Sequence, residues 1–90
     1  MMRVEITVSG RVQGVCFRYY TFETARSLGL KGFVKNLPDG TVSISAEGEV
    51  SSLHELVRCV ESGPPGAIVR TIDVNFSQPS NEFTGFTIRY

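Results

Sequence analysis

The sequence has few of the side chains that bind metals or build disulfide frameworks: one histidine, two cysteines and no tryptophan. His54 has no second histidine or cysteine at ligand spacing, whereas a structural zinc site needs about four ligands. Cys16 and Cys59 are too few for the disulfide framework of a small secreted domain. We therefore expect no metal, no cofactor and two thiols in a cytoplasmic protein. A single Cys16–Cys59 bridge stays open as an alternative.

A surplus of charge and a long apolar run are also missing. Nine basic and nine acidic side chains give a formal net charge of zero, whereas proteins that bind nucleic acids usually carry a basic excess. No apolar run approaches the roughly 18 residues that cross a bilayer, and Met1–Glu5 lacks the apolar core of a signal peptide. We expect no nucleic-acid or membrane partner. A local anion site needs only focused charge, so it remains possible.

The sequence does contain a regular succession of short elements, enough for a single domain over residues 1–90. Val4, Ile6 and Val8 alternate with polar residues, which is the period of a half-buried strand. The segment 41–47 alternates in the same way, so we expect one face of that strand to be wet. Strands are predicted at 3–8, 31–37, 41–47, 68–76 and 86–90, and Pro38-Asp39-Gly40 predicts a hairpin between the second and third.

Apolar residues at three- and four-residue spacing predict two helices. The first spans 17–28 and ends at Gly29, and the second spans 50–60 and stops at Gly63–Gly66. Ser52 and Glu55 have the spacing of a capping box near the start of the second helix. The order β-α-β-β-α-β plus a terminal strand predicts an α+β, ferredoxin-like sandwich. Its antiparallel sheet carries both helices on one face and a short terminal strand.

The segment Gly10–Arg18 joins the first strand to the first helix and has the features of an anion site. The first amides of a helix have no intrahelical acceptor and lie at the positive end of the helix dipole. Gly14 permits a tight turn and a close approach to the backbone. Arg18 adds a guanidinium whose forked donors match phosphate oxygens. We predict that the amides of Gly14, Val15, Cys16, Phe17 and Arg18, together with that guanidinium, bind a phosphoryl group.

Two other phosphate motifs do not fit this segment. A P-loop needs four residues between its glycines and then Lys-Ser/Thr, but only three residues separate Gly10 from Gly14, and Val15 follows. A tyrosine-phosphatase loop places five residues between its cysteine and its arginine, whereas only Phe17 separates Cys16 from Arg18. We therefore interpret Cys16 as a small side chain and not as a thiolate nucleophile.

The sequence resembles the acylphosphatase family along essentially its whole length. The loop Gly10–Arg18 matches the family pattern Gly-x-Val-Gln-Gly-Val-x-Phe-Arg. A second motif, Gly29–Asn36 followed by Asp39–Val42, matches the aromatic-tipped strand that ends in asparagine and a hairpin. Gly63–Ala67 and the ending Phe86–Tyr90 are similar as well. The paired motifs are highly specific, and either one alone would be less so.

The resemblance implies metal-free hydrolysis of acyl phosphates to a carboxylate and inorganic phosphate. It implies that Arg18 binds the phosphoryl group with the loop amides and that Asn36 positions the attacking water. The residue chemistry agrees, because an acyl phosphate already has a good leaving group and needs mainly positioning and charge stabilisation. The expected partner is a small acyl phosphate, or inorganic phosphate in the loop, bound to a monomer. The physiological acyl phosphate is not readable from the sequence.

Two binding functions are alternatives to the enzyme. RNA-recognition domains share the β-α-β-β-α-β order, and Lys31-Gly32-Phe33 begins like their signature. Lys35 occupies the position where they need a second stacking aromatic, which argues against RNA. The second alternative is a module that binds carbamoyl phosphate or another phosphate, as in hydrogenase-maturation proteins. A domain that stands alone disfavours this alternative.

Overall fold

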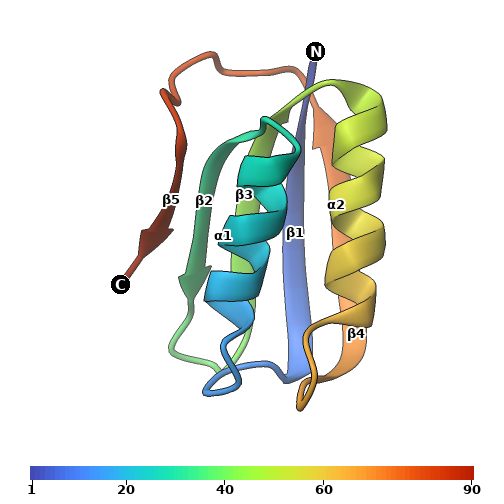
Figure 1. The fold of residues 1–90 in the computed structure, drawn as a ribbon, viewed down its shortest axis with the longest axis vertical. Helices are drawn as coiled ribbons and strands as arrows, with labels where there is room; N and C mark the ends of the chain where they lie inside the picture. Colours follow the sequence, from blue (N-terminus) through green and yellow to red (C-terminus); the bar gives the residue numbers. More distant parts are fainter.

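The structure is a computed structural model that describes residues 1–90, and it contains five strands and two helices (Figure 1). The elements are β1 (Met2–Arg11), α1 (Phe17–Ser27), β2 (Lys31–Asn36), β3 (Val42–Gly48), α2 (Val50–Ser62), β4 (Ile68–Ser77) and β5 (Phe86–Arg89). The predicted element order is confirmed. No helix is long and apolar enough to cross a membrane.

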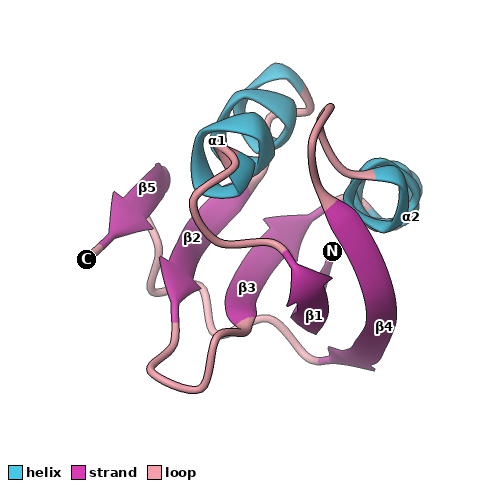
Figure 2. Cartoon of the chain, turned by 90° about the horizontal axis from the view of Figure 1, so that it is seen from below, coloured by secondary structure: helices cyan, strands magenta, loops and turns pink.

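The strands form one sheet in the order β4-β1-β3-β2-β5, with both helices on one face (Figure 2). β1, β2, β3 and β4 pair in antiparallel fashion, which confirms the ferredoxin-like sandwich. The terminal strand differs from the antiparallel prediction because β5 pairs in parallel with β2 and makes the sheet mixed. The chain leaves β4 at one edge, crosses the end of the sheet and enters the opposite edge beside β2 (Figure 1).

The core lies between the sheet and the helices, and it is formed by the apolar residues that recur with the strand period and the helix period. Alternate residues of β1 and β3 point toward the helices because side chains on a strand alternate between faces. The helices present their apolar stripes to this layer. The fully buried side chains include Val4, Ile6, Val8, Phe17, Ala25, Val42, Ile44, Leu53, Leu56 and Val60. Burial of these groups stabilises the fold by roughly 25 cal/mol per Å² of apolar surface.

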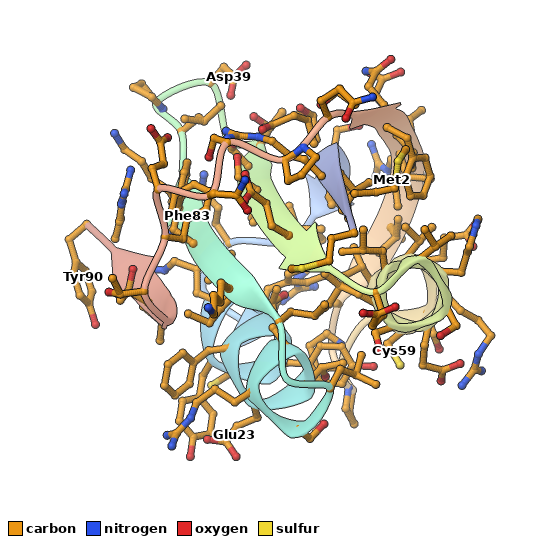
Figure 3. The ribbon with its side chains drawn as sticks, turned by 90° about the horizontal axis from the view of Figure 1, so that it is seen from above. Met2, Glu23, Asp39, Cys59, Phe83 and Tyr90 are labelled. Atoms are coloured by element: carbon orange, nitrogen blue, oxygen red, sulfur yellow. The ribbon has the colours of Figure 1, made fainter.

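The other face of β3 is not wet along its whole length, contrary to the sequence expectation. Ser45 and Glu47 are only 1% and 3% exposed. The segment 78–85 crosses this face, and Figure 3 shows Phe83 on the side of the sheet away from the helices. Glu47 accepts hydrogen bonds from the backbone and hydroxyl of Ser80 at 2.8 and 2.7 Å. It also accepts bonds from the Asn81 amide at 3.0 Å and from Arg3 Nη1 at 3.1 Å.

We call Arg3, Glu47, Ser80 and Asn81 the Glu47 clasp. Burial by itself raises the pKa of Glu47, but the hydrogen bonds from Ser80, Asn81 and Arg3 outweigh burial and hold that pKa below its ordinary value. The clasp fastens the segment that leads into β5. Alternation along β3 could not reveal it, because its partners lie more than thirty positions away in the sequence.

The capping box predicted for the second helix is wrong. α2 begins at Val50, its N-cap is Glu49, and no side chain caps it. Ser52 therefore lies inside the first turn, because the apolar stripe already starts at Val50. The predicted stops are confirmed: Gly29 follows α1 with its amide bonded to the Arg26 carbonyl, and Gly63 ends α2 at φ 70°. These glycine stops set where each helix meets the sheet.

Candidate active site

Three segments meet at one end of the sheet and surround a cavity. They are the loop between β1 and α1, the end of β2, and β5 with the C-terminal residue, which lie at the bottom and lower left of Figure 1. The cavity has a volume of about 400 Å³. Its lining residues are Val12, Gly14, Cys16, Phe17, Arg18, Tyr19, Asn36, Ile88 and Tyr90. Arg18 and Asn36, the two catalytic residues predicted from the sequence, therefore line the same cavity.

The amides of Gly14 to Tyr19 donate to no acceptor on the chain. The first backbone hydrogen bond of α1 runs from the Tyr20 amide to the Cys16 carbonyl at 3.0 Å. Cys16 occupies the N-cap in the left-handed region, at φ 61° and ψ 26°, and turns the loop into the helix. A Cβ at Gly14 would meet nothing within 4 Å, so this side of the loop is open. Unpaired amides at a helix start are what an anion site requires.

Arg18 is the only charged side chain that lines the cavity. Its Nη1 donates to the Arg89 carbonyl at 3.3 Å. The guanidinium carbon lies 4.7 Å from the centre of the Tyr90 ring, within the range of a cation–π contact. No Asp or Glu side chain lines the cavity, so no acidic side chain there opposes the binding of an anion. β5 thus holds the guanidinium, a contact for which the sequence contained no signal.

Asn36 is the last residue of β2. Its Oδ1 is buried and accepts no hydrogen bond from the chain. Buried polar atoms are nearly always paired, so an unpaired acceptor that lines a cavity is well suited to bind a ligand or water. The arrangement therefore combines a cation, several free amides and one free acceptor.

Gln13 joins the loop to the hairpin that follows Asn36. Its Nε2 donates to the carbonyls of Leu37 and Thr41, both at 2.9 Å. The Leu37 amide donates to the same Thr41 carbonyl at 2.9 Å. Gln13 thereby sets the spacing between the loop and the end of β2. Gln13 is one position of the loop motif, and no local pattern in the sequence predicted this role for it.

The remaining predicted groups are placed as follows. Val15 is half-buried, packs against the core and does not line the cavity. Its predicted contribution is therefore limited to its backbone amide. Cys16 is exposed, Cys59 lies on α2, and both are free thiols. The alternative Cys16–Cys59 bridge is therefore not formed. No three His, Cys, Asp or Glu side chains are grouped as metal ligands.

The fold and the cavity together define the class: a small ferredoxin-like α+β protein with a cavity lined by Arg18 and Asn36 at one end of its sheet. A family model described as acylphosphatase matches residues 4–88. The chain is 50% identical to an acylphosphatase of Archaeoglobus fulgidus, with both chains covered completely. It superposes on the crystal structure of acylphosphatase from Bacillus subtilis with a TM-score of 0.96 and 41% identity, again over both full chains.

A larger protein contains a similar unit. The crystal structure of full-length HypF in the phosphate- and nucleotide-bound form matches with a TM-score of 0.87 and 29% identity. All of this chain is matched, but only 12% of that one is covered. The family model and the relative that matches over its full length decide to which family the chain belongs. The chain belongs to the acylphosphatase family, which is a family of hydrolases.

Proposed function

We propose that the chain hydrolyses the carboxyl–phosphate bond of small acyl phosphates to a carboxylate and inorganic phosphate, without a metal or cofactor. Support comes from the match between site and substrate. A carboxylate leaves readily because carboxylic acids have pKa values of about 4. The reaction then needs positioning and stabilisation of charge more than acid catalysis. Amides, a guanidinium and a side-chain amide can supply both.

The phosphoryl group binds to the loop. The amides of Gly14, Val15, Cys16, Phe17 and Arg18 donate to its oxygens, because these amides have no acceptor on the chain. The Arg18 guanidinium adds a charge-assisted bond. Its hydrogen bond to the Arg89 carbonyl and its contact with Tyr90 restrict its position before substrate arrives. Preorganised donors of this kind stabilise charge on the phosphoryl oxygens in the transition state.

Asn36 orients the attacking water. Its buried Oδ1 accepts a hydrogen bond from that water, because no donor on the chain occupies it. The water oxygen attacks phosphorus while the bond between phosphorus and the bridging oxygen breaks, and the electron pair leaves with the carboxylate. The proton lost by the water passes to an oxygen of the phosphate product. An amide is too weak a base to remove this proton, so the role of Asn36 is orientation.

The observation that carries the proposal is that Arg18 and the unpaired Asn36 Oδ1 line one cavity. The test is a substrate panel in the presence of EDTA, containing an aryl acyl phosphate, carbamoyl phosphate and a phosphate monoester. We expect the aryl acyl phosphate to be hydrolysed and the monoester, which has a far worse leaving group, to be stable. No release of phosphate from any acyl phosphate would overturn the proposal.

A phosphate-binding module is the second candidate function. It is favoured by the likeness to a small part of HypF, whose structure is described as phosphate- and nucleotide-bound. Such a module would bind phosphate or carbamoyl phosphate and release no product. Calorimetric binding of inorganic phosphate, measured beside the substrate panel, separates the two functions, because only an enzyme turns the acyl phosphate over.

We also propose that the chain acts as a cytoplasmic monomer. Arg18 and Asn36, on which the proposed chemistry depends, line one cavity of the single chain, so the proposed reaction assigns no role to a second copy. The two free thiols suit a reducing compartment. Sedimentation equilibrium at micromolar concentration tests the monomer, and a dimer mass would contradict it.

A further inference from the structure

The cavity has a polar part and an apolar part, and the proposed reaction uses only the polar part. Gly14, Arg18 and Asn36 serve the phosphoryl group and the water. The lining also includes Tyr19 and Ile88, which have no role in phosphoryl transfer, and Tyr90, which contacts Arg18 with one part of its ring surface. A volume of about 400 Å³ exceeds the needs of a phosphoryl group alone and falls in the usual range of small-molecule sites.

Tyr19 is the exposed large hydrophobic side chain of α1, at 59%. Tyr19 lines the same cavity as Arg18, so a group attached to a phosphoryl group bound at Arg18 can extend toward its ring. Its ring packs against Phe22, with centroids 6.3 Å apart, and the Arg26 guanidinium lies over Phe22 at 5.4 Å. The contact with Phe22 limits the orientations of the Tyr19 ring and leaves the side of the ring toward the cavity free. The Tyr19 hydroxyl donates no hydrogen bond on the chain, so only its apolar ring has a defined environment.

The C-terminal residues supply the other wall. Ile88 is half-buried in β5 and packs against the core. The Tyr90 ring contacts the Arg18 guanidinium yet remains 91% exposed, and Figure 3 shows it at the outer edge beside β5. Apolar side chains that line a cavity beside a single cation favour a ligand with one anionic end and one apolar end.

We propose that Tyr19 is a specificity-determining residue that contacts the acyl group, with Ile88 and Tyr90 as the facing wall. This inference rests on the proposed function and names its substrate class: acyl phosphates with a bulky apolar acyl group are preferred over acetyl and carbamoyl phosphate. Covering one side of an aromatic ring removes tens of Å² of apolar surface from water. That area corresponds to a preference of about fivefold.

The kinetic test compares cyclohexanecarbonyl phosphate with acetyl phosphate. Their carboxylic acids have nearly equal strength, so a difference in kcat/KM reports contact with the acyl group and not leaving-group chemistry. The wild type is expected to prefer the cyclohexane substrate about fivefold, mainly through KM. Tyr19→Ala should reduce that preference to less than about twofold. Tyr19→Phe should preserve it, because the ring and not the hydroxyl makes the contact.

Phe76→Ala is the matched control. Phe76 is also a partly exposed aromatic, at 37%, but it lies on β4, packs against His54 at 5.1 Å and does not line the cavity. Its removal should leave the ratio of the two substrates at the wild-type value. An unchanged ratio in Tyr19→Ala, or an equal drop in Phe76→Ala, would overturn the assignment of Tyr19.

A binding measurement separates this inference from the proposed hydrolysis. Propylphosphonate and 2-cyclohexylethylphosphonate mimic the two substrates, but their phosphorus–carbon bond is not hydrolysed. Calorimetry should show tighter binding of the cyclohexyl compound by about fivefold in the wild type, and a smaller difference in Tyr19→Ala. Equal binding of both compounds by the wild type would overturn the inference even if acyl phosphates are hydrolysed. A Tyr19-dependent preference without any hydrolysis would sustain it and refute the proposed function alone.

Discussion

The two ends of the sheet differ in whether their polar groups have hydrogen-bond partners. At the end that holds the cavity, the amides of Gly14 to Tyr19 and the Oδ1 of Asn36 have no partner on the chain. At the other end, Glu47 of the clasp is 3% exposed and accepts four hydrogen bonds from Ser80, Asn81 and Arg3. Unpaired polar groups cost stability, whereas a fully bonded buried carboxylate holds its surroundings in place.

This difference separates a region that stabilises the fold from a region whose polar groups are free to bind a ligand. The Glu47 clasp fastens the segment 78–85, which leads directly into β5. β5 then pairs with β2 and delivers the Arg89 carbonyl and the Tyr90 ring to Arg18. Substitutions at the cavity should therefore change function with little loss of stability, and substitutions at the clasp should do the reverse.

Arg18→Ala should have the largest effect. Removing the only charged side chain in the cavity should lower kcat/KM for an aryl acyl phosphate about 10³- to 10⁵-fold and abolish detectable phosphate binding. Its melting temperature should stay close to that of the wild type, because the side chain is partly exposed. Steady-state kinetics, phosphate calorimetry and thermal unfolding check the three expectations. Normal turnover would refute the role of Arg18.

Asn36→Ala should come next and should separate turnover from binding. Loss of the water-orienting oxygen should lower kcat about 10²- to 10³-fold, while phosphate still binds to the loop and Arg18. Stability should not fall by the usual amount for a lost polar contact, because Oδ1 has no partner on the chain. Retained kcat, or loss of phosphate binding together with kcat, would contradict the assignment.

Glu47→Ala should act on stability. It removes an acceptor from four buried or partly buried donors, and we expect a loss of roughly 2–4 kcal/mol in the free energy of unfolding. Glu82→Ala is the matched control, because Glu82 is 67% exposed and lies 3.8 Å from the same Arg3. Its loss should change stability by less than about 0.5 kcal/mol. Equal effects of the two substitutions in urea denaturation would refute the clasp.

The same clasp should make a pH-dependent contribution to stability. Hydrogen bonds lower the pKa of Glu47 in the folded protein against the opposing effect of burial. A carboxyl whose pKa is lower when folded stabilises the fold above its unfolded pKa, and this stabilisation is lost as the pH falls through its folded pKa. The free energy of unfolding of the wild type should therefore decrease when the pH falls below the ordinary pKa of a glutamate carboxyl. The decrease should be smaller in Glu47→Ala, and parallel curves would contradict the prediction.

Cys16→Ser should have the smallest effect. The proposed role of Cys16 uses its backbone amide, which serine retains, and places no chemistry on the thiol. We expect kcat/KM to change by less than about threefold, because the thiol is exposed and serine has nearly the same size. Loss of activity by several orders of magnitude would identify a thiolate nucleophile after all.

Local patterns account for the parts of this protein that depend on neighbouring residues. The alternation at Val4, Ile6 and Val8 predicted a strand with one buried face, and the glycines at 29 and 63 predicted the helix ends. The loop motif identified Arg18, and the second motif identified Asn36, which the fold brings to one cavity. Their catalytic roles remain predictions.

The sequence by itself determined the element order, the helix-facing core and the two residues on which the proposed chemistry depends, because these follow from periods of two and 3.6 and from short motifs. Tertiary structure alone decided the parallel pairing of β5, the burial of Glu47, the link from Gln13 to the hairpin and the contact of Tyr90 with Arg18. Each of these features depends on contacts between residues far apart in the chain. No local pattern encodes such contacts, because they form only when the whole sheet has closed.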